Sequence, residues 1–441
     1  MTSLRIVPAG RGLRGSVRVP SDKSVSHRAA ILAALAPGET RIRNYMEGRT
    51  TAATLSCLRS LGVESNKVVE GELVVRGRGL RGLQEASEVL FCQGSGTTMR
   101  LLAGVAAGQP GLTVLDGTPA LRRRPMARVA EPLRAMGATV LAREGGRLPP
   151  LAIQGGQLRG VDWTLPVASA QAKSAVLLAG LWAEGPTTVR EPGPSRDHSE
   201  RMLRAFGVAV ESTDAGAGRV VRLSPPERLQ FPGLLSIPGD ISSAAFLLVA
   251  ALLVPGSQVA VEGVGINPTR TGLLDVLRAM GARIDEENLR EESGEPVADL
   301  TATYCEGLAA TEVGGELVPR AIDEFPTLAV VATQAKGRTV VRDAAELRVK
   351  ESDRISALAE ELRRLGAAVE ERADGFAIDG PTRLRGAHVN AHGDHRLAMA
   401  LAIAGLLAKG ETVVEGWECV ADSFPEFEAT LAQVAGREVS G

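Results

Sequence analysis

The sequence predicts an α/β protein of two similar domains, each built from three βαβαββ units with helices packed inside and sheets outside. Three observations support this: a segment pattern that occurs six times, a glycine that ends a second helix in most repeats, and a composition that is 44% apolar but only 3% aromatic. Small apolar side chains and 50 glycines suit closely packed helices. A chain of 441 residues is long enough for two domains of roughly 200 residues each.

Six segments share one order of features: a small polar or proline-containing start, a helix of Ala and Leu, a glycine and a short β-branched strand. The first three read "PSDKSVSHRAAILAALAPGET", "QGSGTTMRLLAGVAAGQPGLTV" and "PVASAQAKSAVLLAGLWAEGPTTV". The last three read "PGDISSAAFLLVAALLVPGSQVAV", "IDEFPTLAVVATQAKGRTVV" and "NAHGDHRLAMALAIAGLLAKGETVV". Their starts are Pro20, Gln93, Pro166, Pro238, Ile322 and Asn390. This spacing predicts six equivalent units, three in each domain.

Most units continue into a second amphipathic helix, a glycine and another strand. The helix ends are "CLRSLGVE", "EPLRAMGATV", "RMLRAFGVAV", "DVLRAMGARI" and "ELRRLGAAVE". A glycine after the last apolar residue is typical of a helix C-terminus. Such units cannot bury their apolar helices alone, so we expect them to pack in groups around shared cores.

The second half of the chain begins at "SIPGDISS", which repeats the pattern of "RVPSDKSV" near the N-terminus. We therefore expect an N-terminal domain at residues 21–238 and a discontinuous C-terminal domain at residues 1–20 and 239–441. The hinge is expected near Pro20 and Pro238, and the active site in the cleft between the domains.

The charge and the apolar runs exclude several classes of protein. A formal net charge of −2 disfavours a protein that binds nucleic acid or an anionic membrane surface. The longest apolar run, "AAFLLVAALLVP", is too short to span a bilayer, and the N-terminus lacks a signal-peptide core. The four cysteines form no CxxC pair, which is typical of reduced thiols. We expect a cytoplasmic monomer that meets any anionic ligand locally.

The starts of the repeated helices carry the first functional signal. They open with Ser, Thr, Asp or Gly, and capping alone explains any single one of them. Lys23 and Arg28, however, lie at the start of an apolar helix, where the helix dipole disfavours positive charge. Because bare N–H groups at helix starts bind anions, we expect an anion to lie beside these two side chains.

Other polar residues of the first half fit the same interpretation. The glycines of "GSGTTMR" would let a ligand approach the backbone, although such a loop alone is a weak signal. Arg124 precedes Pro125 at a helix start, but a run of arginines is more often a solvated surface. Ser169 and Gln171 in "VASAQAKS" and Ser195 in "PGPSRDHSE" are candidate uncharged donors to an oxyanion.

The second half places acidic and basic groups together at helix starts. Asp323 opens "DEFPTLAV", where an acid also serves as an ordinary cap. Lys350, Glu351 and Arg354 lie in "RVKESDRI", which could be an exposed loop, but a carboxylate between two cations can also relay a proton.

The motif "NAHGDHRLAMA" contains Arg396 and two histidines. With His388, His392 and His395 the spacing could imitate a metal site. The segment has neither a cysteine nor an HExxH pattern, so we expect no metal and no cofactor.

Seven motifs, in order "PSDKSVSHRA", "GSGTTMR", "RPM", "SAQ", "IDEFPTLAV", "RVKESDRI" and "GDHRLAMA", cover nearly the whole chain. Together they closely resemble those of 5-enolpyruvylshikimate-3-phosphate synthases. The resemblance implies a two-domain enolpyruvyl transferase of the shikimate pathway, which leads to the aromatic amino acids. Such an enzyme joins shikimate 3-phosphate to phosphoenolpyruvate and releases phosphate, without a cofactor.

The resemblance also implies a role for each site residue. The shikimate 3-phosphate site would consist of Lys23, Ser24, Arg28, Ser169, Ala170, Gln171, Ser195, Asp323 and Lys350. The phosphoenolpyruvate site would consist of Lys23, Gly96, Arg124, Gln171, Arg354 and Arg396. The catalytic residues would be Lys23, Asp323 as the base, and Glu351, which with Lys350 exchanges a proton at C3 of the enolpyruvyl group. Since these residues fall in both domains, we expect shikimate 3-phosphate to draw the domains together.

Three positions depart from the family pattern, and other functions stay open. Gly94 stands where the family usually has Asn, Glu346 where some relatives have Asn, and Asp422 where some have a substrate-binding Lys. A UDP-N-acetylglucosamine enolpyruvyl transferase would carry a reactive Cys in its loop and Asn after the first Lys, whereas Ser24 follows Lys23 here. An RNA-end-processing protein or a non-catalytic anion-binding protein of related fold would need a basic face or lack the acid pair.

Overall fold

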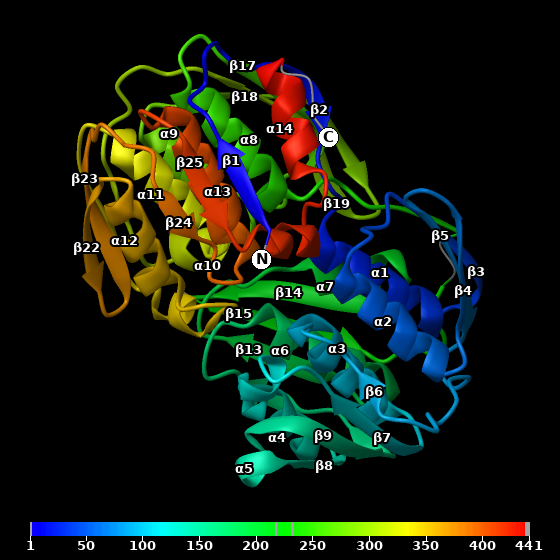
Figure 1. Cartoon of the computed structure of the whole chain (residues 1–441). Helices are drawn as coiled ribbons and strands as arrows, with labels where there is room; N and C mark the ends of the chain where they lie inside the picture. The colour runs from blue at the N-terminus through cyan, green and yellow to red at the C-terminus, as the bar shows by residue number, and fades with distance from the viewer. Residues whose placement is uncertain (1, 217, 231–232, 437–441) are drawn as a thin grey trace. The chain divides into compact units, whose positions relative to one another are not determined.

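The computed structural model describes residues 2–216, 218–230 and 233–436, and the chain forms two compact units (Figure 1). The N-terminal unit is Ser21–Ile237 with Glu291–Glu295, and the C-terminal unit is the rest of the chain. Relative to the predicted division, Pro238 and Glu291–Glu295 change sides. The second change has a physical cause: Oε1 of Glu295 lies 2.8 Å from Nδ1 of His198 in the N-terminal unit.

The N-terminal unit contains three four-stranded sheets with the orders β16-β3-β5-β4, β6-β7-β9-β8 and β11-β13-β15-β14. The first module is α1 (Lys23–Leu35), β3 (Pro37–Arg43), α2 (Arg49–Ser60), β4 (Glu64–Val69), β5 (Glu72–Arg78) and β16 (Leu234–Ser236). The second is β6 (Leu90–Phe91), α3 (Gly96–Gly108), β7 (Gly111–Asp116), η1 (Leu121–Arg123), α4 (Ala127–Ala135), β8 (Thr139–Ala142), the short turn α5 (Arg143–Gly146) and β9 (Leu148–Gly155). The third is β10 (Leu158–Arg159), β11 (Asp162–Thr164), α6 (Ala170–Ala179), η2 (Gly180–Trp182), β12 (Ala183–Glu184), β13 (Thr187–Glu191), α7 (His198–Ala205), β14 (Ala209–Ala215) and β15 (Gly218–Ser224).

The C-terminal unit repeats this architecture in the sheets β18-β19-β17-β2, β20-β21-β23-β22 and β1-β25-β24. Its first module is β2 (Arg14–Arg18), α8 (Ile241–Leu253), β17 (Gln258–Gly265), α9 (Gly272–Ala279), β18 (Arg283–Glu292) and β19 (Glu295–Thr303). The second is β20 (Glu312–Val313), α10 (Leu317–Ala321), α11 (Phe325–Gln334), β21 (Gly337–Val341), η3 (Ala345–Val349), α12 (Arg354–Arg364), β22 (Ala368–Arg372) and β23 (Gly375–Gly380). The third is β24 (His388–Asn390), α13 (His395–Leu407), β25 (Thr412–Glu415), η4 (Trp417–Asp422), α14 (Phe427–Ala435) and β1 (Ser3–Ile6).

The predicted fold class is confirmed, with one correction in the sixth unit. After β25 the chain forms η4 and α14 instead of two further strands. The edge of that sheet is completed by β1, which pairs antiparallel with β25 from the other end of the chain. The sixth module is therefore not a full βαβαββ unit.

The strand before the first helix of each half pairs in the unit that does not contain this helix. β2 precedes α1 in the sequence, yet it pairs in parallel with β17. β16 precedes α8, yet it pairs in parallel with β3. The chain therefore passes between the units after each of these strands, and the backbone N–H of Asp240 donates to Pro20 O at 2.8 Å.

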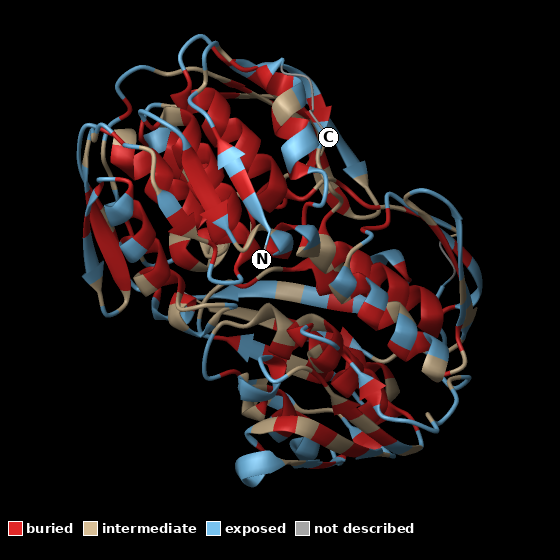
Figure 2. Ribbon diagram, in the orientation of Figure 1, coloured by how far each residue is buried: buried red, intermediate tan, exposed pale blue. Residues whose placement is uncertain are grey.

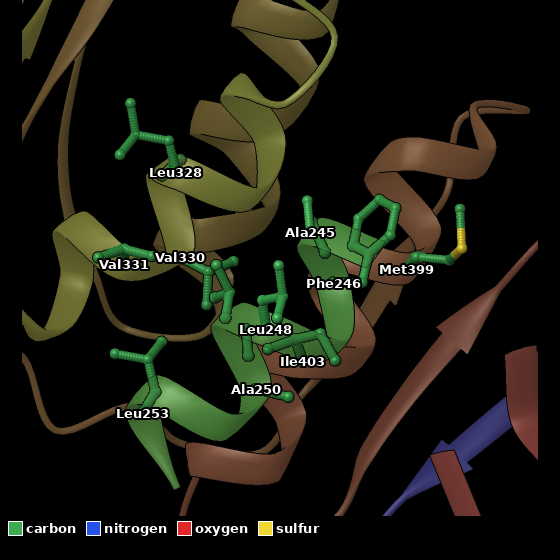
Figure 3. Close-up of a cluster of buried hydrophobic side chains, with 14 of the residues drawn as sticks. Ala245, Phe246, Leu248, Ala250, Leu253, Leu328, Val330, Val331, Met399 and Ile403 are labelled. Carbon is green, nitrogen blue, oxygen red and sulfur yellow. The ribbon is translucent and has the colours of Figure 1, made fainter. Parts of the chain in front are cut away.

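The central helices are apolar on every side, which is typical of helices surrounded by other elements. Every residue of α8 is buried, and Figure 2 shows α8 and α13 almost wholly buried. Figure 3 shows how Phe246 and Leu248 of α8 meet Val330 of α11 and Ile403 of α13 in one core. The C-terminal unit thus holds these three helices inside. No helix in the described ranges is long and apolar enough to cross a membrane.

One close contact between two helices requires a glycine. A Cβ on Gly104 of α3 would lie 2.2 Å from the backbone oxygen of Ala175 in α6. Only glycine allows the two helices to pack this closely, and this packing sets the spacing of the two helix starts.

Candidate active site

Three helix starts of the N-terminal unit lie close together. Nη2 of Arg28 on α1 donates to Oγ of Ser174 on α6 at 2.7 Å. Nε2 of Gln171 on α6 donates to Oγ1 of Thr97 on α3 at 2.9 Å. We call the site residues at these starts, together with Arg124 before α4 and Ser195 before α7, the N-terminal cluster: Lys23, Ser24, Arg28, Gly96, Arg124, Ser169, Ala170, Gln171 and Ser195.

Arg28 is the buried cation of this cluster. Besides Ser174, its guanidinium donates to Oγ of Ser199 at 2.7 Å and to the carbonyl oxygen of Ser24 at 2.9 Å. Burial lowers the pKa of Arg28 to about 10, although Glu200 and Asp22 oppose this shift. The guanidinium therefore stays charged at neutral pH while its hydrogen bonds go to neutral oxygens.

The other members of the cluster lie around α3 and α6. Ser169 is the N-cap of α6 and accepts from Ala172 N at 3.4 Å. Ser195 is buried, and its hydroxyl donates to Oε1 of Glu191. A Cβ on Gly96 would lie 3.5 Å from Nη1 of Arg124. The guanidinium of Arg124 therefore lies beside the start of α3.

Lys23 opens α1 directly after the N-cap Asp22, whose carboxylate accepts from Val25 N at 2.9 Å. Its side chain is half-buried. Burial is the main cause that lowers the pKa of His27 on the same helix, and the charge of Lys23 also contributes. An anion at this helix start would meet both the ammonium group and the positive end of the helix dipole.

A second cluster gathers the starts of α11, α12 and α13 in the C-terminal unit. We call it the C-terminal cluster: Asp323, Lys350, Glu351, Arg354 and Arg396. Arg354 is its centre, because its guanidinium contacts Oε2 of Glu351 at 2.7 Å and Oδ1 of Asp323 at 3.3 Å. Nζ of Lys350 lies 3.8 Å from the same oxygen of Asp323.

Arg396 completes this cluster from α13. Its Nη1 donates to Asp323 O at 3.3 Å, and its Nη2 lies 3.9 Å from Oδ2 of Asp323. Burial lowers the pKa of Arg354, but Asp394, Glu351 and Asp323 outweigh it and raise the pKa above the usual value. The cluster therefore combines two fixed guanidinium charges with two carboxylates able to exchange protons.

Sequence reasoning missed two contributors. Arg100, four residues after Gly96 on α3, donates to Oε1 of Gln171. Its position four residues after Gly96 could have indicated that it lies near the site, because residues at i and i+4 lie on one face of a helix. Asp394 caps α13 and also binds Arg354, but a cap residue gives no sequence sign of a second partner. Of the three positions that depart from the family pattern, Gly94 and Glu346 are exposed and Asp422 is half-buried.

Two of the three histidines considered for a metal site, His388 and His392, line one cavity, and His395 is not among its lining residues. His392 contacts Glu361 at 2.7 Å, and His388 lies 3.7 Å from Glu415. In the described part of the chain, the atoms of Glu360, Glu361 and His392 lie within 4.8 Å of one another. They line a cavity of about 290 Å³ together with Arg364. Arg364 lies 2.7 Å from Glu360 and 3.4 Å from Glu361, so one cation already pairs with both carboxylates.

Comparison with known proteins gives a consistent result over the whole chain. The family model described as EPSP synthase (3-phosphoshikimate 1-carboxyvinyltransferase) matches residues 7–431. The 3-phosphoshikimate 1-carboxyvinyltransferase of Pelotomaculum thermopropionicum is 55% identical over 428 residues, covering 97% of this chain and 98% of that protein. The protein of the same name from Gloeobacter violaceus is 55% identical over 432 residues, with 97% and 98% coverage.

Solved structures agree with this result. The EPSP synthase from Acinetobacter baumannii matches with a TM-score of 0.89 and 41% identity, covering 100% of both chains. The enolpyruvyl transferase NikO from Streptomyces tendae matches with a TM-score of 0.78 and 20% identity over 98% of this chain and 97% of that one. The second likeness shows the fold alone.

Proposed function

This chain belongs to the EPSP synthase family, and we propose that its two clusters divide the work of the family's reaction. The enzyme transfers the enolpyruvyl group of phosphoenolpyruvate to the 5-hydroxyl of shikimate 3-phosphate and releases phosphate. This is a step of the shikimate pathway to the aromatic amino acids. The relatives do not favour a UDP-N-acetylglucosamine enolpyruvyl transferase.

The N-terminal cluster binds the phosphate of shikimate 3-phosphate. The observation that carries this assignment is Arg28, a buried guanidinium whose donors reach two hydroxyls and a backbone oxygen rather than carboxylates. Ser24, Ser169, Ala170, Gln171 and Ser195 supply further polar groups of the same cluster. Charge-assisted hydrogen bonds to a phosphate are about twice as strong as neutral ones.

Phosphoenolpyruvate binds to guanidinium groups of both clusters. Arg354 and Arg396 of the C-terminal cluster, with Arg124 beside Gly96, suit a ligand that carries a carboxylate and a phosphate. Gln171 and the ammonium of Lys23 contribute to the same ligand. Because the arginines keep their charge, they stabilise the negative charge that develops in the transition state.

The carboxylates of the C-terminal cluster perform the proton transfers. Asp323 binds the shikimate hydroxyls with Lys350 and takes the proton of the 5-hydroxyl as it adds to C2 of phosphoenolpyruvate. Glu351, with Lys350, exchanges the proton at C3. The resulting tetrahedral ketal phosphate then loses phosphate and a methyl proton, so an acid and a base are both needed.

Steady-state kinetics of one arginine from each cluster test this division. We expect Arg28→Met to raise KM for shikimate 3-phosphate about a hundredfold and Arg396→Met to raise KM for phosphoenolpyruvate similarly, since each removes charge-assisted hydrogen bonds. Arg122→Met is the matched control, because Arg122 is exposed and pairs with Asp116. The division fails if Arg28→Met affects only KM for phosphoenolpyruvate. The cleft between the domains and action as a cytoplasmic monomer stay predictions of the sequence.

A further inference from the structure

A cavity of about 290 Å³ in the C-terminal unit is lined by residues that belong to neither cluster. It lies where α12 packs beside β24 (Figure 1), and the turn after β24 and the end of β25 complete it. Its charged and titratable lining residues are Glu360, Glu361, Arg364, His388, His392 and Glu415. Carboxylates and imidazoles together are ligands that transition metals bind.

Three of these side chains place possible ligand atoms close together. Glu360, Glu361 and His392 each offer one atom, and these atoms all lie within 4.8 Å of one another. Nε2 of His392 lies 2.7 Å from Oε1 of Glu361. Around a tetrahedral Zn²⁺ with bonds of about 2.1 Å, the ligand atoms lie about 3.4 Å apart. Small shifts of the three side chains therefore suffice to reach that geometry.

Glu361 is the group that most needs a cation. Its side chain is only 1% exposed, and its Oε2 makes no hydrogen bond in the described part of the chain. Nε of Arg364 lies 3.4 Å from this oxygen, but not in hydrogen-bond geometry. A buried carboxylate oxygen without a hydrogen bond is unfavourable. A cation in the cavity that Glu361 lines would supply the missing partner.

The cavity also carries more negative than positive charge. Among its described lining residues, Glu360, Glu361 and Glu415 are carboxylates, whereas Arg364 is a guanidinium without a second one beside it. The side chain of Arg364 is 53% exposed where it pairs with Glu360 at 2.7 Å. Because exposed ion pairs contribute little to stability, Arg364 can turn to solvent and leave its place to a divalent ion.

We propose that Glu360, Glu361 and His392 bind a divalent transition-metal ion, probed here by Zn²⁺, with water at the remaining position. Three protein ligands and one open position are common for Zn²⁺. On binding, Nε2 of His392 gives up its proton to Nδ1 of the same ring or to solvent. Its hydrogen bond to Glu361 and the pair of Arg364 with Glu360 are then lost, so both contacts compete with the metal. The proposal does not depend on the proposed function.

The site would connect two segments of the C-terminal unit. Glu360 and Glu361 lie on α12, and His392 lies in the turn between β24 and α13. Oδ1 of Asn390 accepts from the backbone N of His392 at 2.6 Å and holds this turn. A metal ion would therefore tie α12 to the segment that leads into α13. The sequence gave no reason to expect it, because the two glutamates lie on a different helix from any histidine.

Calorimetric titration of the untagged, chelator-treated chain with zinc chloride measures stoichiometry and affinity. We expect one Zn²⁺ per chain at micromolar concentration. Mg²⁺ should not bind, because it dehydrates reluctantly and prefers oxygen ligands in an octahedron. X-ray absorption at the zinc edge should show nitrogen and oxygen ligands at about 2.0–2.2 Å. Absence of zinc binding by the wild type would overturn the proposal.

His392→Gln and Glu361→Gln test the ligands. Each glutamine can keep the hydrogen bond between the two side chains, but an uncharged amide is a poor ligand for Zn²⁺. We expect each variant to bind zinc at least about tenfold more weakly, since even the loss of an outer partner of a ligand costs 10–100-fold. His392→Gln decides the question if Glu361→Gln does not fold, because the side chain of His392 is 33% exposed.

His388→Gln is the matched control. His388 lines the same cavity, 3.7 Å from Glu415, but it is not one of the three grouped residues. We expect its zinc affinity to stay within about twofold of the wild type, as for most surface substitutions. A loss in His388→Gln together with unchanged binding by His392→Gln would overturn the assigned ligands.

Arg364→Gln tests the competition, because it removes the cation that pairs with both glutamates. We expect zinc to bind about threefold more tightly, the factor that an exposed ion pair is worth. If Glu360 and Glu361 served only to pair with Arg364, the wild type and all variants would show the same weak binding. That result, or weaker binding by Arg364→Gln, would contradict the metal site.

Discussion

Nε of Arg354 lies 2.7 Å from Oδ2 of Asp394, so the first residue of α12 is bound to the residue that caps α13. The other oxygen of Asp394 accepts from the backbone N of Arg396 at 3.0 Å. One carboxylate thus contacts two of the three arginines that we assign to phosphoenolpyruvate, the side chain of Arg354 and the backbone of Arg396. Burial raises the pKa of Asp394, but Arg354 and His395 outweigh burial and lower it, so the carboxylate stays charged.

Asp394→Asn is expected to weaken the use of phosphoenolpyruvate without removing the helix cap. Asparagine caps helices as well as aspartate does, whereas the charged bond to Arg354 is lost. We expect kcat/KM for phosphoenolpyruvate to fall by a factor that corresponds to about 1.5–3 kcal/mol. Initial rates at varied phosphoenolpyruvate measure this change. An unaltered kcat/KM would show that Asp394 does not position Arg354.

Lys23→Met is expected to remove a charged contact with both substrates. The loss in kcat/KM should correspond to about 2–4 kcal/mol of transition-state stabilisation. Lys23→Arg should also fail, because a planar guanidinium does not replace a compact ammonium group. Lys67→Met is the control, since Lys67 is an exposed lysine paired with Glu47. Near-normal turnover of a folded Lys23→Met enzyme would refute the role of this lysine.

Glu351→Gln is expected to slow turnover while leaving shikimate 3-phosphate binding nearly intact. Glu351 is exposed and contacts Arg354 at 2.7 Å. Glutamine can keep that contact but cannot transfer a proton. Asp323→Asn should harm both binding and turnover. If Glu351→Gln changed KM alone, the group would bind substrate rather than exchange a proton.

His27 should make the folded chain less stable as the pH falls. Burial, aided by Lys23 and Arg28, lowers the pKa of His27 from 6.5 to about 3. Between these values the unfolded chain binds a proton that the folded chain does not, so the contribution of His27 is complete above pH 6.5 and shrinks below it. The free energy of unfolding should therefore fall by about 1.4 kcal/mol per pH unit through this group.

Urea unfolding of the His27→Gln variant at several pH values measures this slope. The amide can keep the contact that Nδ1 of His27 makes with Thr54 at 2.7 Å, and it does not titrate. We expect the variant to lose that part of the pH dependence. His388→Gln is the control, because the side chain of His388 is 75% exposed. Equal slopes in the wild type and the His27→Gln variant would contradict a buried neutral His27.

The repeated architecture could be predicted because each unit has a recognisable pattern within a short segment of the sequence. Helix period, a terminal glycine such as Gly137, and β-branched strands lie within one short segment. The pairing of β1 with β25 in the sixth sheet could not be predicted, because no local pattern encodes pairing between the two ends of a chain. Glu361 was missed for a similar reason: its partner His392 lies before another helix, and only the folded chain shows that the two meet.

The site residues also fall into those that the local sequence indicates and those that only the fold shows. Lys23 and Arg28 stood out because positive charge is unfavourable at a helix start. Asp394 was not singled out, because its partner Arg354 comes from another helix. Local sequence therefore shows which groups are unusual where they stand, and the fold decides which groups act together.

Phosphate release by the purified chain is the most direct test of the central claim. Shikimate 3-phosphate and phosphoenolpyruvate are supplied together and singly, and the organic product is identified by mass. We expect one phosphate per enolpyruvyl group transferred, only when both substrates are present, and no release when UDP-N-acetylglucosamine replaces shikimate 3-phosphate. Release without shikimate 3-phosphate, or none with both substrates, would contradict the assignment.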